Sequence, residues 1–340
     1  MVQGPLEDGS GFPVEDPIEA GWRILRETPP LAAWRLLHRL RAEVLDGIAR
    51  TVGRPKPLQG LSRDFLGVRV EHPIGIAAGL DKDASMVWLA WSMGAGFHVV
   101  GSVLPHPYPG VEPKVLVRLS DGGTINRLGL PSKGPSRVVE RLSMHKPPGM
   151  PVAVSIAAFT PKGYGEVYRA VSGHAAWVEV NISCPNVETH RTFEDPEEVE
   201  TICSYLKPRT SPILLKIPPT RDDALLKRYV DAATSCGFQG IVAGNTMKIT
   251  YKGLNAGLGG PRLFNTTLYM IKRLRTHAPE GFKLIGVGGI NNGAKAATLL
   301  KAGADLIEVL SAIIHRGPRT PWTIAKELST KRTNNNPQTS

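Results

Sequence analysis

Residues 213–244 read ILLKIPPTRDDALLKRYVDAATSCGFQGIVAG. The stretch begins and ends with short runs rich in Ile, Leu and Val that do not alternate with polar residues, as in strands buried on both faces. Between them the spacing predicts a helix over 222–236, with Asp222 as its N-cap and Gly237 at its end. Its apolar stripe consists of Leu226, Tyr229, Val230 and Ala233.

The same alternation of strand and helix runs along most of the chain. The predicted strands are Ile74–Ala78, Phe97–Gly101, Val152–Ile156, Trp177–Ile182, Ile213–Ile217, Gly240–Gly244, Leu284–Val287 and Asp305–Val309. The predicted helices cover 84–93, 132–143, 163–172, 196–207, 222–236, 264–277, 292–302 and 319–328. Eight strands, each followed by a helix, predict an α/β fold of the (β/α)8 TIM barrel type. A doubly wound open sheet is the alternative, and it would typically end after five or six strands.

Three segments follow from this pattern. We expect an N-terminal helical extension over 1–58, the barrel over 59–328 and a polar, Asn-rich disordered tail over 329–340. The long insertion after the second strand is expected to hold an antiparallel pair, Val115–Arg118 and Thr124–Asn126.

The composition is that of a globular protein. Of 340 residues, 41% are hydrophobic and 21% charged, which excludes a disordered chain. Three cysteines are too few for a disulfide framework. Because no apolar run reaches about 18 residues and no signal peptide is recognisable, a cytoplasmic protein is expected.

The net charge of +11 is concentrated near the N-terminus. Residues 21–57 hold eight Lys and Arg against three acidic residues, within two predicted helices, one from about Asp16 to Glu27 and one from about Leu31. One face of the second helix carries Leu37, Leu40, Val44 and Ile48. The pair is interpreted either as an extension packed on the barrel, which is favoured, or as an amphipathic contact with an anionic membrane surface.

Polar residues stand where the predicted strands end. They include Lys82, Ser102, Ser155, Asn181, Cys184, Lys216, Asn245, Thr246 and Ser311. Functional groups of barrel enzymes collect at the carboxyl ends of the strands, and such groups are costly to bury without partners. The pattern therefore predicts a polar ligand at the mouth of the barrel.

Two glycine clusters predict a phosphate site. They are Gly257-Leu258-Gly259-Gly260 after the sixth strand and Gly286-Val287-Gly288-Gly289 at the end of the seventh. Glycine lets backbone N–H groups approach a phosphate closely, and barrels commonly bind phosphate at these loops. Glycines that serve only as turn residues are the simpler explanation of either cluster alone.

From about Leu61 to Pro318 the chain resembles the dihydroorotate dehydrogenase family of flavin barrels. The matching segments, in family order, are Ile74–Asp83, Gly101–Pro105, Ile125–Leu130, Val180–Asn186, Leu215–Pro219, Gly244–Thr246, Gly257–Pro261 and Gly286–Ile290. The resemblance implies FMN as cofactor and oxidation of dihydroorotate to orotate in pyrimidine biosynthesis.

The resemblance also implies roles for single residues. The implied FMN-binding residues are Ala78, Gly79, Lys82, Ser102, Asn181, Lys216, Gly244, Gly259, Gly260, Gly288, Gly289 and Ser311. The implied substrate-binding residues are Lys82, Asn126, Gly129, Leu130, Asn181, Asn186, Asn245 and Thr246. Lys216 would lie beside the pyrimidine edge of the flavin and stabilise the negative charge of its reduced form.

Cys184 stands at the position of the family's catalytic base. A thiolate there would take the proton from carbon 5 of dihydroorotate while a hydride leaves carbon 6 for the flavin. An inert buried thiol is the simpler alternative for a single cysteine. Cys203 and Cys236 are interpreted as structural. No spacing of histidines or cysteines predicts a metal site.

The family features are mixed, so the electron acceptor is left open between quinone, fumarate, and NAD through a partner subunit. Cys184, Pro218-Pro219 and Asn126 with Gly129-Leu130-Pro131 resemble the soluble class 1 enzymes. The extension, Gly79–Lys82 and Gly101–Val103 resemble the membrane-associated, quinone-reducing class 2. Peripheral contact through 16–52 with the inner face of a membrane, and a homodimer, are open for the same reason. The loop Val187–Asp195 is expected to be a substrate lid.

Two other functions remain alternatives. One is an FMN barrel acting on another pyrimidine, either a dihydropyrimidine or dihydrouridine in tRNA. The other is a non-redox barrel isomerase with a phosphorylated substrate, which would give Cys184 and Lys216 no joint role. No nucleic-acid partner is expected, because the basic residues gather in the extension and not around the barrel mouth.

Overall fold

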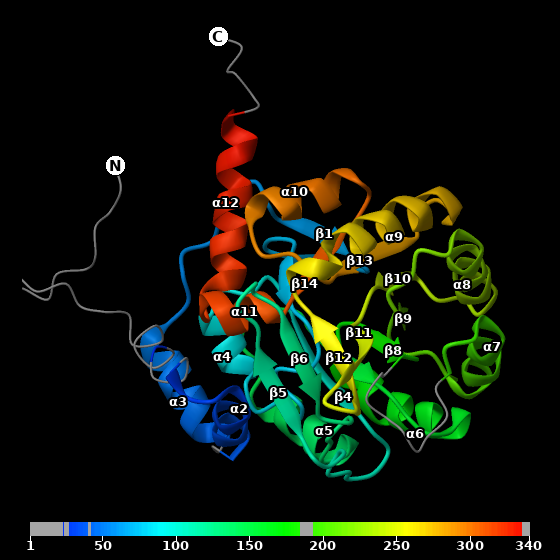
Figure 1. The fold of residues 1–340 in the computed structure, drawn as a ribbon, viewed down its shortest axis with the longest axis horizontal. Coiled ribbons are helices and arrows are strands. Elements are labelled where there is room, and N and C mark those ends of the chain that lie inside the picture. The colour runs from blue at the N-terminus through cyan, green and yellow to red at the C-terminus, as the bar shows by residue number, and fades with distance from the viewer. Residues whose placement is uncertain (1–22, 24–26, 40–41, 184–192, 335–340) are drawn as a thin grey trace, which may run out of the picture.

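Eight parallel strands close into a barrel at the centre of the molecule (Figure 1). The computed structural model describes residue 23 and residues 27–39, 42–183 and 193–334. Around the barrel and in chain order the strands are β3 (Ile74–Ile76), β4 (His98–Val103), β7 (Val152–Ile156), β8 (Val178–Asn181), β9 (Ile213–Ile217), β10 (Gly240–Ala243), β13 (Lys283–Val287) and β14 (Leu306–Val309). The last strand pairs in parallel with the first, which closes the barrel.

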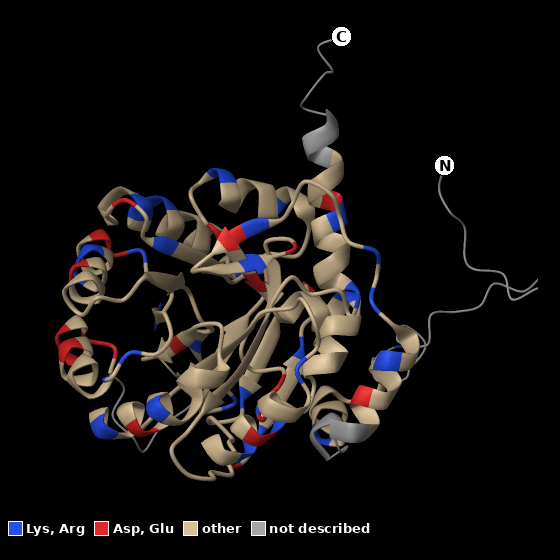
Figure 2. Ribbon diagram, turned by 180° about the vertical axis from the view of Figure 1, so that it is seen from behind, with Lys and Arg blue, Asp and Glu red and all other residues tan. Residues whose placement is uncertain are grey.

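Helices lie on the outside of the barrel, and all but the last two connect consecutive barrel strands. They are α4 (Val87–Ser92), α5 (Pro135–Met144), α6 (Pro161–Val171), α7 (Pro196–Tyr205), α8 (Asp223–Ser235), α9 (Phe264–His277), α10 (Gly293–Lys301), α11 (Ser311–Arg316) and α12 (Thr320–Asn334), with short 3-10 turns at Ser172–His174 and Pro261–Leu263. The predicted (β/α)8 barrel is confirmed. Lys and Arg are interspersed with Asp and Glu over these outer helices (Figure 2).

Local signals located most of these elements. The bounds of β7 and β9 coincide with the prediction, and Asp222 caps α8 by accepting a hydrogen bond from Leu225 N at 3.1 Å. Helix α11 was not predicted. Helix α12 continues to Asn334, so the prediction of a disordered tail from residue 329 is wrong for 329–334, while 335–340 lie outside the described residues.

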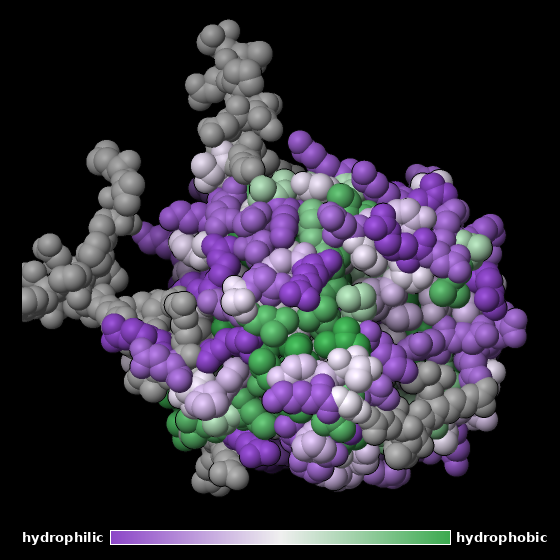
Figure 3. Space-filling view, viewed as in Figure 1, coloured by the Kyte–Doolittle hydropathy of each residue, from purple (hydrophilic) through white to green (hydrophobic). Residues whose placement is uncertain are grey.

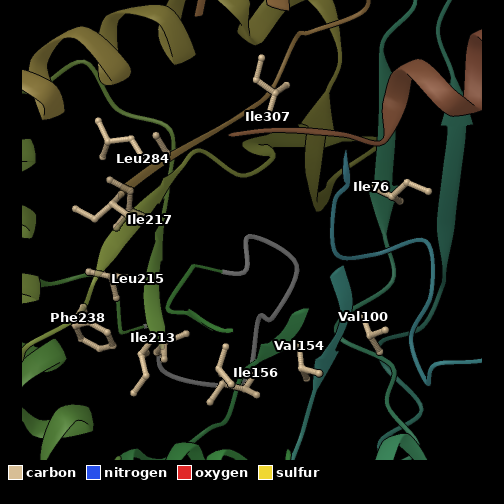
Figure 4. Packing of buried hydrophobic residues seen from close by; sticks show 14 of the residues in the cluster. Ile76, Val100, Val154, Ile156, Ile213, Leu215, Ile217, Phe238, Leu284 and Ile307 are labelled. Carbon is tan, nitrogen blue, oxygen red and sulfur yellow. The ribbon is translucent and has the colours of Figure 1, made fainter. Parts of the chain in front are cut away.

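Two apolar layers account for the strand pattern. One lies between the strands and the outer helices, and Figure 4 labels ten of its residues. The other fills the barrel interior and includes Trp177, Leu214 and Leu306. Phe65 and Val70 join this inner cluster from the hairpin of β1 (Arg63–Phe65) and β2 (Val68–Val70). The amino-terminal end of the barrel is therefore filled with apolar side chains, and polar groups gather toward the other end.

A four-stranded antiparallel sheet stands over the carboxyl ends of the barrel strands. Its order is β11 (Met247–Tyr251), β12 (Leu254–Gly259), β6 (Thr124–Arg127) and β5 (Val115–Arg118). The predicted pairing of the last two is confirmed. The hairpin of β11 and β12 was not predicted, and it corrects the expectation of a loop over Gly257–Gly260, because Gly257 to Gly259 are strand residues paired with β6.

The extension packs on the barrel through helices α2 (Pro30–Arg39) and α3 (Ala42–Val52). Arg118 of β5 donates to Thr28 O at 2.9 Å beside the start of α2. On α3, Leu45 and Ala49 are buried, and the Arg50 guanidinium lies 4.2 Å from the ring centre of Trp88 in α4. The favoured interpretation, in which the extension packs on the barrel, is therefore correct for α3.

The face of α3 that packs on the barrel differs from the apolar face predicted from the sequence. Val44 and Ile48 are 46% and 47% exposed, and Leu36 on α2 is 50% exposed. The buried face lies one residue further along α3, at Leu45 and Ala49. Most of the predicted helix from Asp16 to Glu27 lies outside the described residues. Among the helices that the structure describes, none is long and apolar enough to cross a membrane.

Candidate active site

One cavity opens at the carboxyl ends of the barrel strands, beneath the four-stranded sheet and α2. It brings together residues predicted from separate parts of the sequence. The predicted site residues that line it are Ala78, Gly79, Lys82, Ser102, Asn126, Gly129, Leu130, Asn181, Lys216, Asn245, Thr246, Gly259, Gly260, Gly288, Gly289 and Ser311. Gly244 does not line it; a Cβ at that position would lie 2.3 Å from Val287 O, so close strand packing accounts for this glycine. Cys184 and Asn186 lie outside the described residues.

Amides and hydroxyls are linked across the centre of the cavity. Asn181 Nδ2 donates to Ser102 Oγ at 3.0 Å, and Ser102 Oγ lies 2.8 Å from Ser155 Oγ. Asn245 Nδ2 reaches Asn181 Oδ1 at 3.3 Å and Ser183 Oγ at 3.0 Å. These hydrogen bonds connect the carboxyl ends of β4, β7, β8 and β10, so the polar groups are held in place before any ligand binds. Ser183 was not predicted as part of the site.

A buried carboxylate shapes the loop that carries Lys82. Asp81 is fully buried and accepts hydrogen bonds from Ser85 N at 3.0 Å and Met86 N at 3.1 Å. His98 Nε2 of β4 lies 3.2 Å from its Oδ2. These contacts fix the turn after β3 and place Lys82 at the cavity wall.

The floor of the cavity holds a buried lysine between two glutamates. Lys216 Nζ of β9 lies 3.0 Å from Glu308 Oε2 of β14 and 3.4 Å from Glu179 Oε2 of β8. The side chains are at most 5% exposed. Burial alone would lower the pKa of Lys216, but its contacts with the two neighbouring glutamates outweigh burial and raise this pKa to about 12. Lys216 is therefore a fixed cation.

The two glutamates were not predicted as part of the site. A signal was present in the sequence, because each interrupts an apolar strand, in Val178–Asn181 (VEVN) and Leu306–Val309 (LIEV). An ionisable residue inside a strand that is otherwise buried is rare unless it has a partner. The sequence does not name that partner, since the three residues come from three different strands.

Glycines and hydroxyls form a cradle at one side of the cavity. A Cβ at Gly259 would lie 2.8 Å from Ser311 Oγ, which is itself 2.6 Å from Thr124 Oγ1. Gly288 and Gly289 have φ of +120° and +84°, and a Cβ at Gly289 would lie 2.3 Å from Phe264 N. Bare backbone and hydroxyl donors in one concave place suit a phosphate group. Among the described residues, no cluster of His, Cys, Asp and Glu is arranged to hold a metal ion.

Apolar residues form another part of the cavity lining, which reaches the extension and also includes Arg118, His315 and Arg316. Pro30, Ala33 and Trp34 of α2 line it, together with Leu116 of β5 and Ile314 of α11. Apolar residues gather at the centre of this face and also near α2 (Figure 3). The site thus joins a polar interior to an apolar passage formed by a segment distant in sequence.

A closed parallel barrel with a polar cavity at the carboxyl ends of its strands, and a buried lysine in the floor of that cavity, has the architecture of a barrel enzyme. Residues 60–331 match the family model described as dihydroorotate dehydrogenase. The chain belongs to the dihydroorotate dehydrogenase family, whose members oxidise dihydroorotate in pyrimidine biosynthesis.

Similar proteins of known name share this family. A protein named dihydroorotate dehydrogenase (quinone) from Christiangramia forsetii is 32% identical over 276 residues, which cover 76% of this chain and 81% of that one. One of the same name from Mycobacterium tuberculosis is 32% identical over 309 residues, covering 83% and 86%. The crystal structure of DHODH from Eimeria tenella in complex with ferulenol superposes with a TM-score of 0.78 at 23% identity, covering 94% and 96% of the two chains, and shows the fold.

Proposed function

We propose that this protein binds FMN in the cavity, oxidises dihydroorotate to orotate and passes the electrons to a quinone. The observation that carries the proposal is the continuity of one cavity. Its polar part holds Lys216 and the amides, one side forms the phosphate cradle, and the other side is the apolar passage beneath α2.

The residues present fit FMN. The cradle of Gly259, Gly260, Gly288, Gly289 and Ser311 would hold the phosphate through backbone N–H groups and a hydroxyl. The flavin, when bound, supplies the chemistry of accepting a hydride. Lys216 then supplies a fixed positive charge in the floor of the same cavity, where it would stabilise the negative charge that reduction adds.

The amide cluster fits a ring that alternates N–H and C=O groups. Asn126, Asn181 and Asn245 each offer both a donor and an acceptor, and all three line the cavity. Lys82 adds a positive charge suited to the substrate carboxylate. Cys184 follows Ser183, whose Oγ and main-chain oxygen both accept from Asn245, and we propose the Cys184 thiolate as the base.

The apolar passage supports quinone over fumarate or NAD as the acceptor. Pro30, Ala33 and Trp34 present little charge to a soluble anionic or dinucleotide oxidant, whereas a quinone ring is apolar and flat. The similar proteins reported above are named for quinone. The passage is built partly by the extension, which gives residues 30–34 a role beyond packing.

The exposed apolar residues of the extension support peripheral membrane contact. Leu36, Val44 and Ile48 are each about half exposed on α2 and α3, and α2 also supplies residues of the passage. An amphipathic surface that inserts such residues at a membrane would let a lipid-soluble quinone enter the passage. We propose that the protein lies on the cytoplasmic side of the membrane. The homodimer stays a prediction.

Anaerobic reduction by substrate tests the proposed reaction. We expect the purified protein to be yellow and its flavin absorbance to bleach when dihydroorotate is added without oxygen, then to return on addition of a quinone. A sample whose flavin is bleached by dithionite but not by dihydroorotate would contradict the substrate assignment and favour another pyrimidine. A sample without bound flavin would contradict the cofactor.

Filling the passage tests the acceptor. We expect Ala33→Trp to lower kcat/KM for a soluble short-chain quinone by about tenfold or more, because the larger side chain enters the cavity that Ala33 lines. Anaerobic bleaching by dihydroorotate should keep its rate. Ala32→Trp, on the exposed side of the same helix, is the matched control and should change neither rate. Equal loss of both half-reactions in Ala33→Trp would contradict a separate quinone passage.

A further inference from the structure

The three charged residues in the cavity floor form one layer of the barrel interior. Inward-facing positions recur every second residue along a strand. Trp177, Leu214 and Leu306 belong to the inner apolar cluster, and Glu179, Lys216 and Glu308 stand two residues further along the same three chain segments. The charged layer therefore rests on a dry apolar layer and faces the cavity, which Lys216 and Glu308 line.

The hydrogen bonds of the two glutamates differ. Glu179 is bonded at both oxygens, since Oε1 accepts from Trp177 Nε1 at 3.4 Å and Oε2 faces Lys216. Glu308 Oε2 accepts from Lys216 at 3.0 Å, but its Oε1 is buried and, within the described part of the chain, has no donor. A buried carboxylate oxygen without a donor is costly, whereas a protonated one becomes a donor itself.

Among the described residues, the strand neighbours of Glu308 supply no second cation. Its neighbours in the barrel are Gly75 on β3 and Val287 on β13, neither of them titratable. Burial, and then the nearby Glu179 carboxylate, raise the pKa of Glu308 well above its usual range, although Lys216 acts in the opposite direction. If both glutamates were ionised, the layer would carry one uncompensated negative charge out of water.

We propose that Glu308 is a positioning residue that holds a proton in the working enzyme, so that the layer beneath the cofactor is electrically neutral and not anionic. Glu179 is then the ionised partner of Lys216. The Glu308 carboxylic acid directs its O–H toward Glu179 and leaves its carbonyl oxygen to Lys216.

The consequence concerns the flavin and rests on the proposed FMN site. Hydride transfer brings two electrons and one proton to FMN and leaves one negative charge on its ring. An anionic floor would oppose that charge, whereas a neutral floor containing the Lys216 ammonium favours it. The Glu308 proton thus helps to set how strongly the site prefers reduced over oxidised FMN, without touching the substrate.

Infrared spectroscopy of the holoenzyme tests the proton directly. We expect the difference spectrum between wild type and Glu308→Gln at neutral pH to contain the C=O stretching band of a buried carboxylic acid. Glu308→Gln replaces the acid by a neutral group of the same shape, so the fold should persist. A difference spectrum that shows only the loss of a carboxylate band would overturn the proposal.

The preference for reduced FMN gives a second, independent measurement. This preference is the ratio of the affinities for reduced and oxidised FMN, with the reduced form prepared by dithionite. The measurement needs no dihydroorotate, so its result does not depend on the substrate assignment. We expect Glu308→Gln and Glu179→Gln each to change the ratio of the two FMN affinities by less than about threefold, because one proton is released or retained to keep the layer neutral. The double variant leaves Lys216 unpaired and should raise the preference for reduced FMN on the order of tenfold or more.

The opposite pattern would overturn the proposal. If both glutamates are ionised, each single variant removes a negative charge and by itself raises the preference for reduced FMN on the order of tenfold. Lys162→Gln, at an exposed surface pair with Glu166, is the control for removal of a distant charge and should leave the ratio unchanged. If the double variant does not fold, the single variants and the infrared band still show whether Glu308 is protonated.

Discussion

Cys184→Ala is expected to retain FMN and to lose turnover by about 100-fold to 10,000-fold at neutral pH, the range that a positioned general base contributes. Alanine has no group that can take the carbon 5 proton, while the cradle and Lys216 that are proposed to hold the flavin are unchanged. Rapid mixing with dihydroorotate, followed at the flavin absorbance, measures the loss in the reductive step itself.

The matched control is another cysteine of the same chain. Cys203 lies in α7, half-buried and without a place in the cavity, so Cys203→Ala should keep full activity. Cys184→Ser should regain part of the rate only as the pH rises, because a hydroxyl has a higher pKa than a thiol. A Cys184→Ala variant that keeps more than a few per cent of the rate would mean that another group is the base.

Lys216→Met is expected to lower the free energy of unfolding by about 3–5 kcal/mol and to abolish FMN retention. The substitution removes the cation that contacts both buried glutamate side chains and leaves an ionised one unpaired, which is the costly way to break a buried ion pair. Chemical denaturation of the flavin-free proteins measures the first effect, and the flavin absorbance after gel filtration measures the second.

The pH dependence of this loss has a definite sign. Burial already raises the pKa of Glu308 well above its usual range, and removal of the Lys216 charge raises it further, so the folded variant holds this proton to higher pH than the unfolded chain or the wild type does. Stability of Lys216→Met should therefore fall further below wild type as the pH rises above the usual carboxylate range. A gap that stays constant from pH 5 to pH 8 would argue against a charge-based cause.

An exposed lysine provides the contrast. Lys227 pairs with Asp231 one helical turn away at 2.6 Å, and both side chains are more than half exposed. Lys227→Met should change stability by no more than about 0.5 kcal/mol, because water screens and solvates both charges. A loss for Lys216→Met as small as that for Lys227→Met would contradict an electrostatic role of Glu179, Lys216 and Glu308 in the cavity floor.

Elements governed by neighbouring residues were predictable from the chain. The apolar run of β7 begins after Pro151, and that of β9 ends before Pro218. Asp222 caps its helix as expected, and Asn292, the first residue of the predicted helix 292–302, accepts at Oδ1 from Lys295 N at 2.9 Å. The hairpin of β11 and β12 was missed because its glycines were assigned to phosphate binding. Helix α11 is too short for a periodic pattern.

The barrel, its family and most of the residues that surround the cavity were predictable from the sequence, because strand runs, caps and strand-end polar groups depend on near neighbours. Tertiary structure alone decided that Glu179 and Glu308 share Lys216, since three strands distant in sequence bring them together. It also decided which face of α3 is buried and that α2 completes the cavity. Periodicity defines a helix face, but only the packed barrel selects the face that leaves water.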